Sequence, residues 1–413
     1  MPRINANALE DDLLLRGVWE GLGTPQCHIT GGYVRDRLLG RDSIDLDLVL
    51  PGDIEAVAGP ARRLAARLDT RAHVLGRDAN RVWRIECPEI KIELWPLGNL
   101  SADDDISRRD FSCNALFWQL PNGPLDDRIG GRKDLEAGVI RALSAQNLED
   151  DPVRLVRAAR FLAQLEGFKL DPQTADWIGS LAPAVSDAPR ERVGQELLKL
   201  LAAPGAADGL RNLLELGLLE PAAPAAARCD LDWIESNLTA ATRLCGSASH
   251  PVAASVQAGG NAPRLALIFR AWGCPDADSV APFAWSRSER RHAARAAALL
   301  DHALTTVAAP AADRRAFIHA AGTAFPATLA VAAAVEPDRN WARWWRLWRK
   351  QGQTLVNPNQ LLSGEEIASI LDLEPGPQLG RAIDALTKAQ VRGEVRTVTG
   401  ARRWLEAWST GSG

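Results

Sequence analysis

The chain has 413 residues, of which 46% are hydrophobic and 24% charged, and its formal net charge is −4 at pH 7. Because this length exceeds one typical core, we expect several domains, and the composition is ordinary for a globular protein. The net charge excludes a wholly basic nucleic-acid coat, although a local arginine stripe could still bind RNA.

The chain carries no pattern of a targeting or membrane segment. Its first residues, MPRINANALEDD, are acidic and polar, unlike a secretory signal. No apolar run approaches the roughly 20 residues needed to cross a bilayer, so we predict no membrane segment. The six cysteines are scattered without a CxxC pair, which predicts free thiols in a reducing cytoplasm. No feature predicts a protein partner or an oligomeric state.

The chain changes character near residue 141. Residues 28–140 mix short alternating apolar segments with helical ones, which predicts an α+β domain. Beyond them, Ala, Leu and Arg recur at helical spacing, which predicts an all-helical remainder. Trp341, Trp344, Trp345 and Trp348 fall at i, i+3, i+4 and i+7, the pattern of a helix face packed in a core. Residues 287–350 are rich in Ala and Arg but carry no interpretable motif.

A pair of glycines precedes the first candidate site. Gly31-Gly32 would let the backbone approach a phosphate closely, and the helix that follows would carry Arg35 one turn in. Most such pairs are only turns, so this one gains weight from standing about ten residues before two aspartates.

The segment 43–50, SIDLDLVL, alternates as a strand does. Ile44, Leu46 and Leu48 fall on one face, and Asp45 and Asp47 fall on the other. Two carboxylates so placed are about 7 Å apart at Cα and can converge on a metal. Oxygen ligands favour Mg²⁺ over softer metals. The alternative is a solvated strand face.

A second strand, residues 90–95, places Glu93 opposite its apolar face of Ile90, Ile92 and Leu94. If both strands share a sheet, three carboxylates meet on one surface, which suits a two-metal phosphoryl-transfer site. Whether Glu93 is a true third carboxylate stays open at this point.

Further along, four charged residues recur at every third position: Asp151, Arg154, Arg157 and Arg160. On a helix they would form a slanted stripe along one side. A carboxylate beside a guanidinium can match the donor and acceptor pattern of a base edge. The alternative is a ladder of salt bridges on a solvated helix.

Six motifs in order resemble those of the class II tRNA nucleotidyltransferases (CCA-adding enzymes) and the related bacterial poly(A) polymerases. They are GGYVRDRLLG with DSIDLDLVL, SRRDFSCNALFW, LDDRIGGRKDL, LEDDPVRLVRAARF, ERVGQELLKLL and the segment 361–395. The resemblance implies a polymerase β-type head with a small mixed sheet at 1–140. A helical neck would follow at 141–205, a helical body at 206–350 and a helical tail at 351–413.

The resemblance also implies roles for residues of the head. Asp45 and Asp47 match metal-binding aspartates, and Glu93 stands as the candidate third catalytic carboxylate. Gly32 and Arg35 match residues that hold the triphosphate of the incoming nucleotide.

For the bases, Asp151 and Arg154 match the pair that reads the edge of CTP or ATP. Arg109, Arg157 and Arg160 match further nucleotide contacts. The implied cofactor is Mg²⁺, and the implied partners are CTP, ATP and a tRNA held at its 3′ end and elbow.

The implied reaction is CCA addition or repair at the 3′ end of tRNA. The region 69–84 lacks the common HGT-type loop of the family, which bears on the switch from C to A addition. A CC-adding or A-adding specialist and a poly(A) polymerase are therefore alternatives. From another class, an RNA-binding protein with an inactive transferase domain is a further alternative, against which the intact Asp45 and Asp47 weigh.

Overall fold

The computed structural model describes residues 9–23, 27–76, 81–223, 230–246, 260–271, 273, 278, 283 and 285–411. It divides into two compact units. The first comprises residues 1–189 and 212–222, and the second comprises 190–211 and 223–413. The predicted boundaries of head, neck, body and tail stay predictions, because they follow the family pattern rather than these units.

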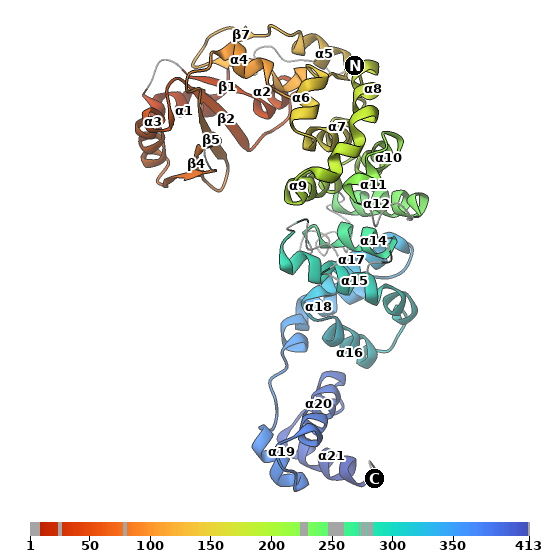
Figure 1. Cartoon of the computed structure of the whole chain (residues 1–413). Coiled ribbons are helices and arrows are strands. Elements are labelled where there is room, and N and C mark those ends of the chain that lie inside the picture. The colour runs from red at the N-terminus through yellow and green to blue at the C-terminus, as the bar shows by residue number, and fades with distance from the viewer. Residues whose placement is uncertain are drawn as a thin grey trace. The chain divides into compact units, whose positions relative to one another are not determined.

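The first unit contains a mixed seven-stranded sheet in the order β3-β4-β5-β2-β1-β6-β7. Its strands are β1 (His28–Thr30), β2 (Asp45–Leu50), β3 (Ala72–Leu75), β4 (Val82–Glu86), β5 (Lys91–Pro96), β6 (Phe117–Gln119) and β7 (Leu125–Asp126). Only β2 and β5 pair in parallel, and every other pair is antiparallel. The predicted α+β head with a mixed sheet is confirmed (Figure 1).

The remaining elements of the first unit are mostly helices. They are α1 (Leu13–Leu22), α2 (Gly32–Leu38), α3 (Ile54–Arg67), α4 (Ala102–Ser107), η2 (Ser112–Asn114), α5 (Gly131–Ala137), α6 (Ala145–Asp150), α7 (Val153–Gln164), α8 (Pro172–Leu181), η3 (Ala182–Asp187) and α11 (Leu219–Ala222). Helix α3 packs against α1 and against β3, β4 and β5. A short parallel pair, β8 (Val139–Ile140) with β9 (Lys169–Leu170), is the exception to the helical remainder expected after residue 141.

Alternation along the strands places the core as predicted, with one exception. Leu46 and Leu48 of β2 and Ile92 and Leu94 of β5 are fully buried. Ile44 was expected on the same apolar face but is 66% exposed, because it precedes the first paired residue of β2. The polar face of the same two strands is therefore free to carry the carboxylates.

The second unit contains helices and connecting segments but no strand among its described residues. Its elements are α9 (Arg190–Ala202), α12 (Leu231–Gly246), α14 (Ala262–Ala271), α15 (Arg287–Thr306), α16 (Ala311–Ala321), η6 (Gly322–Ala324), α17 (Phe325–Val335), α18 (Ala342–Val356), α19 (Gly364–Leu371), α20 (Pro377–Arg392) and α21 (Val398–Gly411), while α10 (Ala206–Glu215) belongs partly to each unit. Trp341, Trp344 and Trp345 are buried, and Trp348 stacks on Phe325 with ring centroids 5.1 Å apart. The tryptophan face thus packs in the core, as predicted.

One stretch is long and apolar enough to cross a membrane, judged by length and composition alone, contrary to the sequence expectation. It runs over 25 residues, Ala311–Val335. Of its apolar window, 72% is buried within the protein. Such burial is what a core helix of a helical bundle shows, because its apolar side chains already contact neighbouring helices.

Candidate active site

The two carboxylate strands lie side by side at the centre of the sheet. In the parallel register of β2 and β5, Asp47 stands opposite Glu93 and Asp45 stands opposite Lys91. The expectation that these strands share a sheet is therefore confirmed. Asp47 is partly buried, whereas the Asp45 side chain is 67% exposed.

Glu93 is held by basic side chains rather than left free. It pairs with Arg84 of β4, and the Lys91 Nζ lies 3.3 Å from its Oε1. The same Nζ lies 3.7 Å from an Asp45 oxygen. Among the described residues, no group of three His, Cys, Asp or Glu side chains is placed to hold a metal ion together. The register of the two strands brings the three predicted carboxylates onto one surface. Two of them, Asp45 and Glu93, are already paired with the same Lys91 side chain.

Asp45 and Asp47 nevertheless fit a magnesium ion, although Asp45 also lies 3.7 Å from the Lys91 Nζ. Mg²⁺ is usually bound through one or two protein carboxylates together with substrate phosphates and water, rather than by a closed protein cage. Asp45 and Asp47, two residues apart on one strand face, supply such a partial ligand set.

Asp47 also carries an electrostatic signature of such a site. Burial raises the pKa of its carboxyl to about 6, with repulsion from Glu93 and Asp45 adding to the effect. Arg109 and a hydrogen bond from Trp95 act in the opposite direction. When a cation binds beside a carboxyl that is crowded by like charges, it offsets their repulsion and favours the ionised form of the carboxyl.

The turn from β1 into α2 lies against this carboxylate. Gly31 has φ +73°, and a Cβ at this position would lie 3.2 Å from Asp47 Oδ2 and 3.6 Å from Arg109 Nη1. Both the backbone conformation and the close approach favour glycine here. Gly32 follows as the first residue of α2, so the glycine pair is part of the same site as Asp47.

Arg35 is a buried anchor in this structure, at 6% exposure. It donates to both carboxylate oxygens of Asp36, at 2.9 and 2.8 Å, and to Asn114 Oδ1 at 2.8 Å. Its guanidinium also lies 5.0 Å from the centroid of the Phe161 ring. A contact with a triphosphate would require Arg35 to exchange one of these partners.

Arg109 lies near the same glycine turn, next to the carboxylate of Asp47. It donates to Asp105 Oδ2 at 2.7 and 3.2 Å and lies 5.0 Å above the Phe117 ring. Because Arg109 lowers the pKa of Asp47, its positive charge reaches the centre of the site.

Asp151 departs from the predicted continuous helix. It lies between α6 and α7, with φ −143° and ψ 87°, so the expected stripe is wrong at its first residue. The cause is Pro152, since a residue before proline is disfavoured in the helical conformation. Asp151 nevertheless approaches Arg154, with Oδ2 and Nε 3.7 Å apart.

The three arginines of α7 have different partners. Arg154 donates to the Asn147 carbonyl at 2.8 Å, and Arg157 donates to Asp110 Oδ2 at 2.9 Å. Arg160 is buried, bonds Gln164 and lies 4.1 Å from the Phe161 ring centroid.

Asp110 is the buried carboxylate of this group. Burial alone would raise its pKa, but Arg157, Asn114 and the Phe111 amide hold the pKa below its ordinary value. Asp110 therefore stays an anion and fixes Arg157 in place.

A cleft of about 870 Å³ joins these groups. Five of the predicted residues line it: Asp47, Glu93, Arg109, Arg154 and Arg157. The other five do not line the cleft within the described part of the chain: Asp45, Gly32, Arg35, Asp151 and Arg160. Other lining residues were not among the predicted site residues, and they include Arg81, Trp95, Asp105, Arg108, Asp110 and Asn147.

For some of these residues the sequence did contain a signal that pointed to the site. Asp105, Arg108 and Asp110 lie within or beside the quoted segment SRRDFSCNALFW, where the charged residues next to Arg109 could have been considered. Asn147 carried none, because its role depends on folding: its amide donates to the carbonyls of Ser107 and Arg109, at 2.7 and 2.8 Å.

Comparison with known proteins agrees with this geometry. Residues 27–141 match the "Poly A polymerase head domain" and residues 167–229 match the "Probable RNA and SrmB-binding site of polymerase A". The fold resembles that of the Bacillus stearothermophilus CCA-adding enzyme in complex with CTP, with a TM-score of 0.74, 22% identity and coverage of 96% of this chain and 97% of that chain. A nucleotidyltransferase head followed by helical domains is thus the class that the fold defines.

Two relatives of similar length narrow this class. The chain is 31% identical to the A-adding tRNA nucleotidyltransferase of Deinococcus radiodurans, over 93% of this chain and 96% of that protein. It is 30% identical to the CC-adding tRNA nucleotidyltransferase of Thermus thermophilus, over 92% and 93% respectively. The chain belongs to the class II tRNA nucleotidyltransferase and poly(A) polymerase family.

Proposed function

We propose that this chain adds nucleotides from CTP or ATP to the 3′ end of tRNA. One observation carries the proposal: Asp47, Arg109, Arg154 and Arg157 line a single cleft, and Asp47 and Arg109 lie beside the glycine turn. An anionic group that can bind a metal, cations that can bind phosphates and a polar pair that can read a base are the parts that nucleotidyl transfer requires. Relatives that act on tRNA match nearly the whole chain.

Mg²⁺ is the cofactor that the carboxylates fit, with Asp45 and Asp47 as its proposed ligands. When bound, it would supply positive charge for the reacting oxygens and the triphosphate. The chain's own part is to place the reactants: Asp47 holds its position against Gly31, and Arg109 supplies positive charge beside it. Catalysis then rests mainly on positioning and charge neutralisation.

The remaining proposed roles belong mostly to residues that do not themselves line the cleft. Gly32 and Arg35 are proposed to hold the triphosphate, Arg35 after exchanging a partner. Asp151 is proposed to accept from the exocyclic amine that cytosine and adenine share, while Arg154 donates to the neighbouring ring nitrogen. Arg157 and Arg160 would keep this region in place through Asp110 and Phe161.

Full CCA addition is our first proposal for the product. A single specialist activity is the second, because the two relatives of matching length named above are an A-adding and a CC-adding tRNA nucleotidyltransferase. Part of the segment whose departure from the family pattern bears on this choice, residues 77–80, lies outside the described residues.

The test uses three tRNAs, which lack the whole CCA end, its last two nucleotides or only the final A. Each is incubated with CTP alone, ATP alone or both, and the products are resolved at single-nucleotide length. Stepwise extension of all three tRNAs to the full CCA end, with both triphosphates incorporated, supports CCA addition. Incorporation from CTP alone or from ATP alone, whichever tRNA is offered, identifies a specialist. Long A tails identify a poly(A) polymerase. Binding of tRNA without extension would contradict the proposal and favour an RNA-binding protein with an inactive head.

A further inference from the structure

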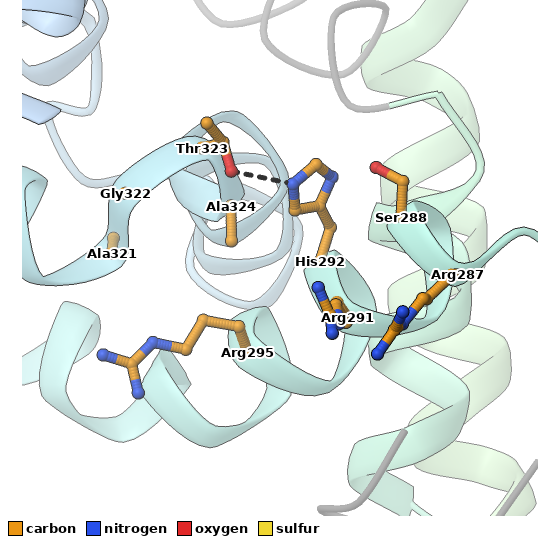
Figure 2. Close-up of a pocket in the computed structure, with 9 residues that line it drawn as sticks. All are labelled: Arg287, Ser288, Arg291, His292, Arg295, Ala321, Gly322, Thr323 and Ala324. Atoms are coloured by element: carbon orange, nitrogen blue, oxygen red, sulfur yellow. Dashed lines mark hydrogen bonds between the residues drawn. The ribbon is translucent and has the colours of Figure 1, made fainter. Parts of the chain in front are cut away.

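A basic pocket in the second unit lies outside the active-site cleft. Its volume is about 480 Å³, and α15 contributes Arg287, Arg291, His292 and Arg295 to its wall. The opposite wall is the junction of α16, η6 and α17, including Gly322 and Thr323. Figure 2 shows the four basic side chains rising from one helix, with the junction segment across from them.

The three arginines share one face of α15 because they recur at every fourth residue. Successive positions are about 6 Å apart along the helix axis, so the charges form a row rather than a point. All three are exposed. A row of this kind suits a chain of regularly spaced anions better than a single small ion.

Among the residues that the structure describes, no acidic side chain neutralises the charges of this row. Arg287 and Arg291 pair with no acidic side chain among those the structure describes, and Arg295 donates only to the Ala320 carbonyl, at 2.8 Å. Farther along α15 the situation differs, since Asp301 binds Arg270 of α14 at 2.8 Å. Glu289, near the row in sequence, is instead engaged by Ser286 and Asn261.

The pocket also holds polar groups in a fixed arrangement. His292 Nε2 and the Thr323 hydroxyl are 2.9 Å apart and are joined by a hydrogen bond across the pocket (Figure 2). At the junction, the Phe325 amide already donates to the Gly322 carbonyl and Pro326 has no N–H, so the positive charge of the pocket comes from the side chains of α15.

We infer that the Arg287–Arg291–Arg295 row docks the phosphodiester backbone of the RNA substrate. The guanidinium group donates two parallel hydrogen bonds to a phosphate, which distinguishes an arginine row from a diffuse lysine surface. This inference rests on the proposed function, because it names a second place at which the same RNA is held. It gives a role to the Ala- and Arg-rich stretch that no sequence motif explained.

The test is a full-length variant with Arg287→Gln and Arg291→Gln, which spares Arg295 because that residue bonds a backbone carbonyl. Binding of tRNA is measured over a series of NaCl concentrations. Loss of two phosphate contacts should weaken binding roughly tenfold and reduce the slope of log Kd against log salt by about 1.5. The KM for tRNA should rise in parallel, while turnover at saturating tRNA and the KM for CTP stay at the wild-type values.

The matched control is Arg346→Gln with Arg349→Gln. Both residues are exposed on α18 and lie outside the pocket lining, and the variant loses the same net charge. An equal loss of affinity in both variants would show a general charge effect and overturn the inference. Wild-type affinity and salt slope in the pocket variant would also overturn it.

A second arm distinguishes RNA from a free anion or an acidic protein. Inorganic phosphate and polyglutamate are titrated calorimetrically against wild type and the pocket variant. If the variant loses one of these ligands but keeps wild-type tRNA binding, the pocket has another occupant and the inference is wrong. If wild type extends tRNA and only the pocket prediction fails, the proposed function stands; if wild type neither binds nor extends tRNA, both fail.

Discussion

Two helices of this protein carry a row of arginines, and their surroundings differ. On α7, Arg154, Arg157 and Arg160 recur at every third residue, and each is bound to a group of the same unit. On α15, Arg287 and Arg291 have no acidic partner among the described residues. The spacing of arginines alone does not distinguish an internal network from a surface that can bind a ligand. The partners that the folded protein supplies to each arginine make that distinction.

The largest expected effect comes from the carboxylates near the α7 row. Asp45→Ala and Asp47→Ala should each lower nucleotide addition by about 10³-fold, because each removes a proposed ligand of the metal. Single-turnover extension of tRNA in Mg²⁺ is the measurement, and an unchanged circular dichroism spectrum is the control for folding. The pocket variant on α15 should keep its turnover at saturating tRNA. Near-wild-type rates in either aspartate variant would contradict the proposed metal site.

Asp151→Ala distinguishes two roles for Asp151 beside the α7 row: recognition of the nucleotide base, and an ion pair with Arg154 that only stabilises the fold. A base-reading contact is worth about 1–3 kcal/mol of discrimination, so UTP and GTP should compete better by at least about fivefold. A salt bridge with Arg154 alone predicts a lower melting temperature with selectivity unchanged. Relative incorporation of all four triphosphates, measured together with the melting temperature, decides between the two. Wild-type selectivity would return Asp151 to the structural interpretation.

Asp110→Asn tests how far the α7 row depends on its partner. The variant leaves Arg157 without its buried counter-charge and should lower the free energy of unfolding by about 2 kcal/mol. Because the pKa of Asp110 is depressed in the folded protein, its stabilisation is present above the ordinary carboxyl pKa and is lost as pH falls through the folded value. In denaturant titrations, the difference in unfolding free energy between wild type and variant should therefore be constant near neutral pH and shrink as the pH falls below the ordinary carboxyl pKa. Arg291→Gln on α15 is the matched control, expected within about 0.5 kcal/mol of wild type.

Glu93→Gln should lower turnover about tenfold while nucleotide affinity changes little, since the charge matters most in the transition state. A second cause of lower turnover is the Lys91 side chain. It lies between Glu93 and Asp45, so without the Glu93 charge it would pair more fully with Asp45. Lys91→Met is the companion variant and should lower the Mg²⁺ concentration needed for half-maximal rate. Unchanged turnover in Glu93→Gln would leave Glu93 as a structural ion-pair residue only.

The smallest expected effect is a pH-dependent one on stability. With its pKa raised to about 6, Asp47 binds a proton more tightly when folded, so the unfolding free energy of the metal-free protein falls as pH rises from about 4 to 6. Asp47→Asn removes this cost and should melt a few degrees above wild type at pH 7.5 in EDTA, with the difference vanishing near pH 4. A variant that melts below wild type at pH 7.5 would refute this account of Asp47.

The parts of the site that depend on a local sequence pattern could be predicted from the sequence. Alternation in 43–50 and 90–95 predicted which faces carry Asp47 and Glu93, and the parallel pairing of the two strands brought them opposite each other. Local pattern could not predict partners distant in sequence. Arg35 and Asn114 are 79 residues apart, and Arg157 and Asp110 are 47 apart.

The error at Asp151 also has a local cause. The every-third-residue pattern from Asp151 suggested a single helix, although Pro152 within it disfavours the helical conformation of the preceding residue. A proline inside a periodic charge pattern is thus stronger evidence for a boundary than the pattern is for continuity.

The path of the chain has a consequence for its synthesis. Residues 190–211 belong to the second unit, yet 212–222 return to the first, where Leu213, Leu218 and Leu219 are buried. On the ribosome, the first unit therefore cannot complete its core until residue 222 has emerged, after part of the second unit has already been made. A gene fragment that stops at residue 189 would encode a first unit with an open apolar surface, prone to aggregate.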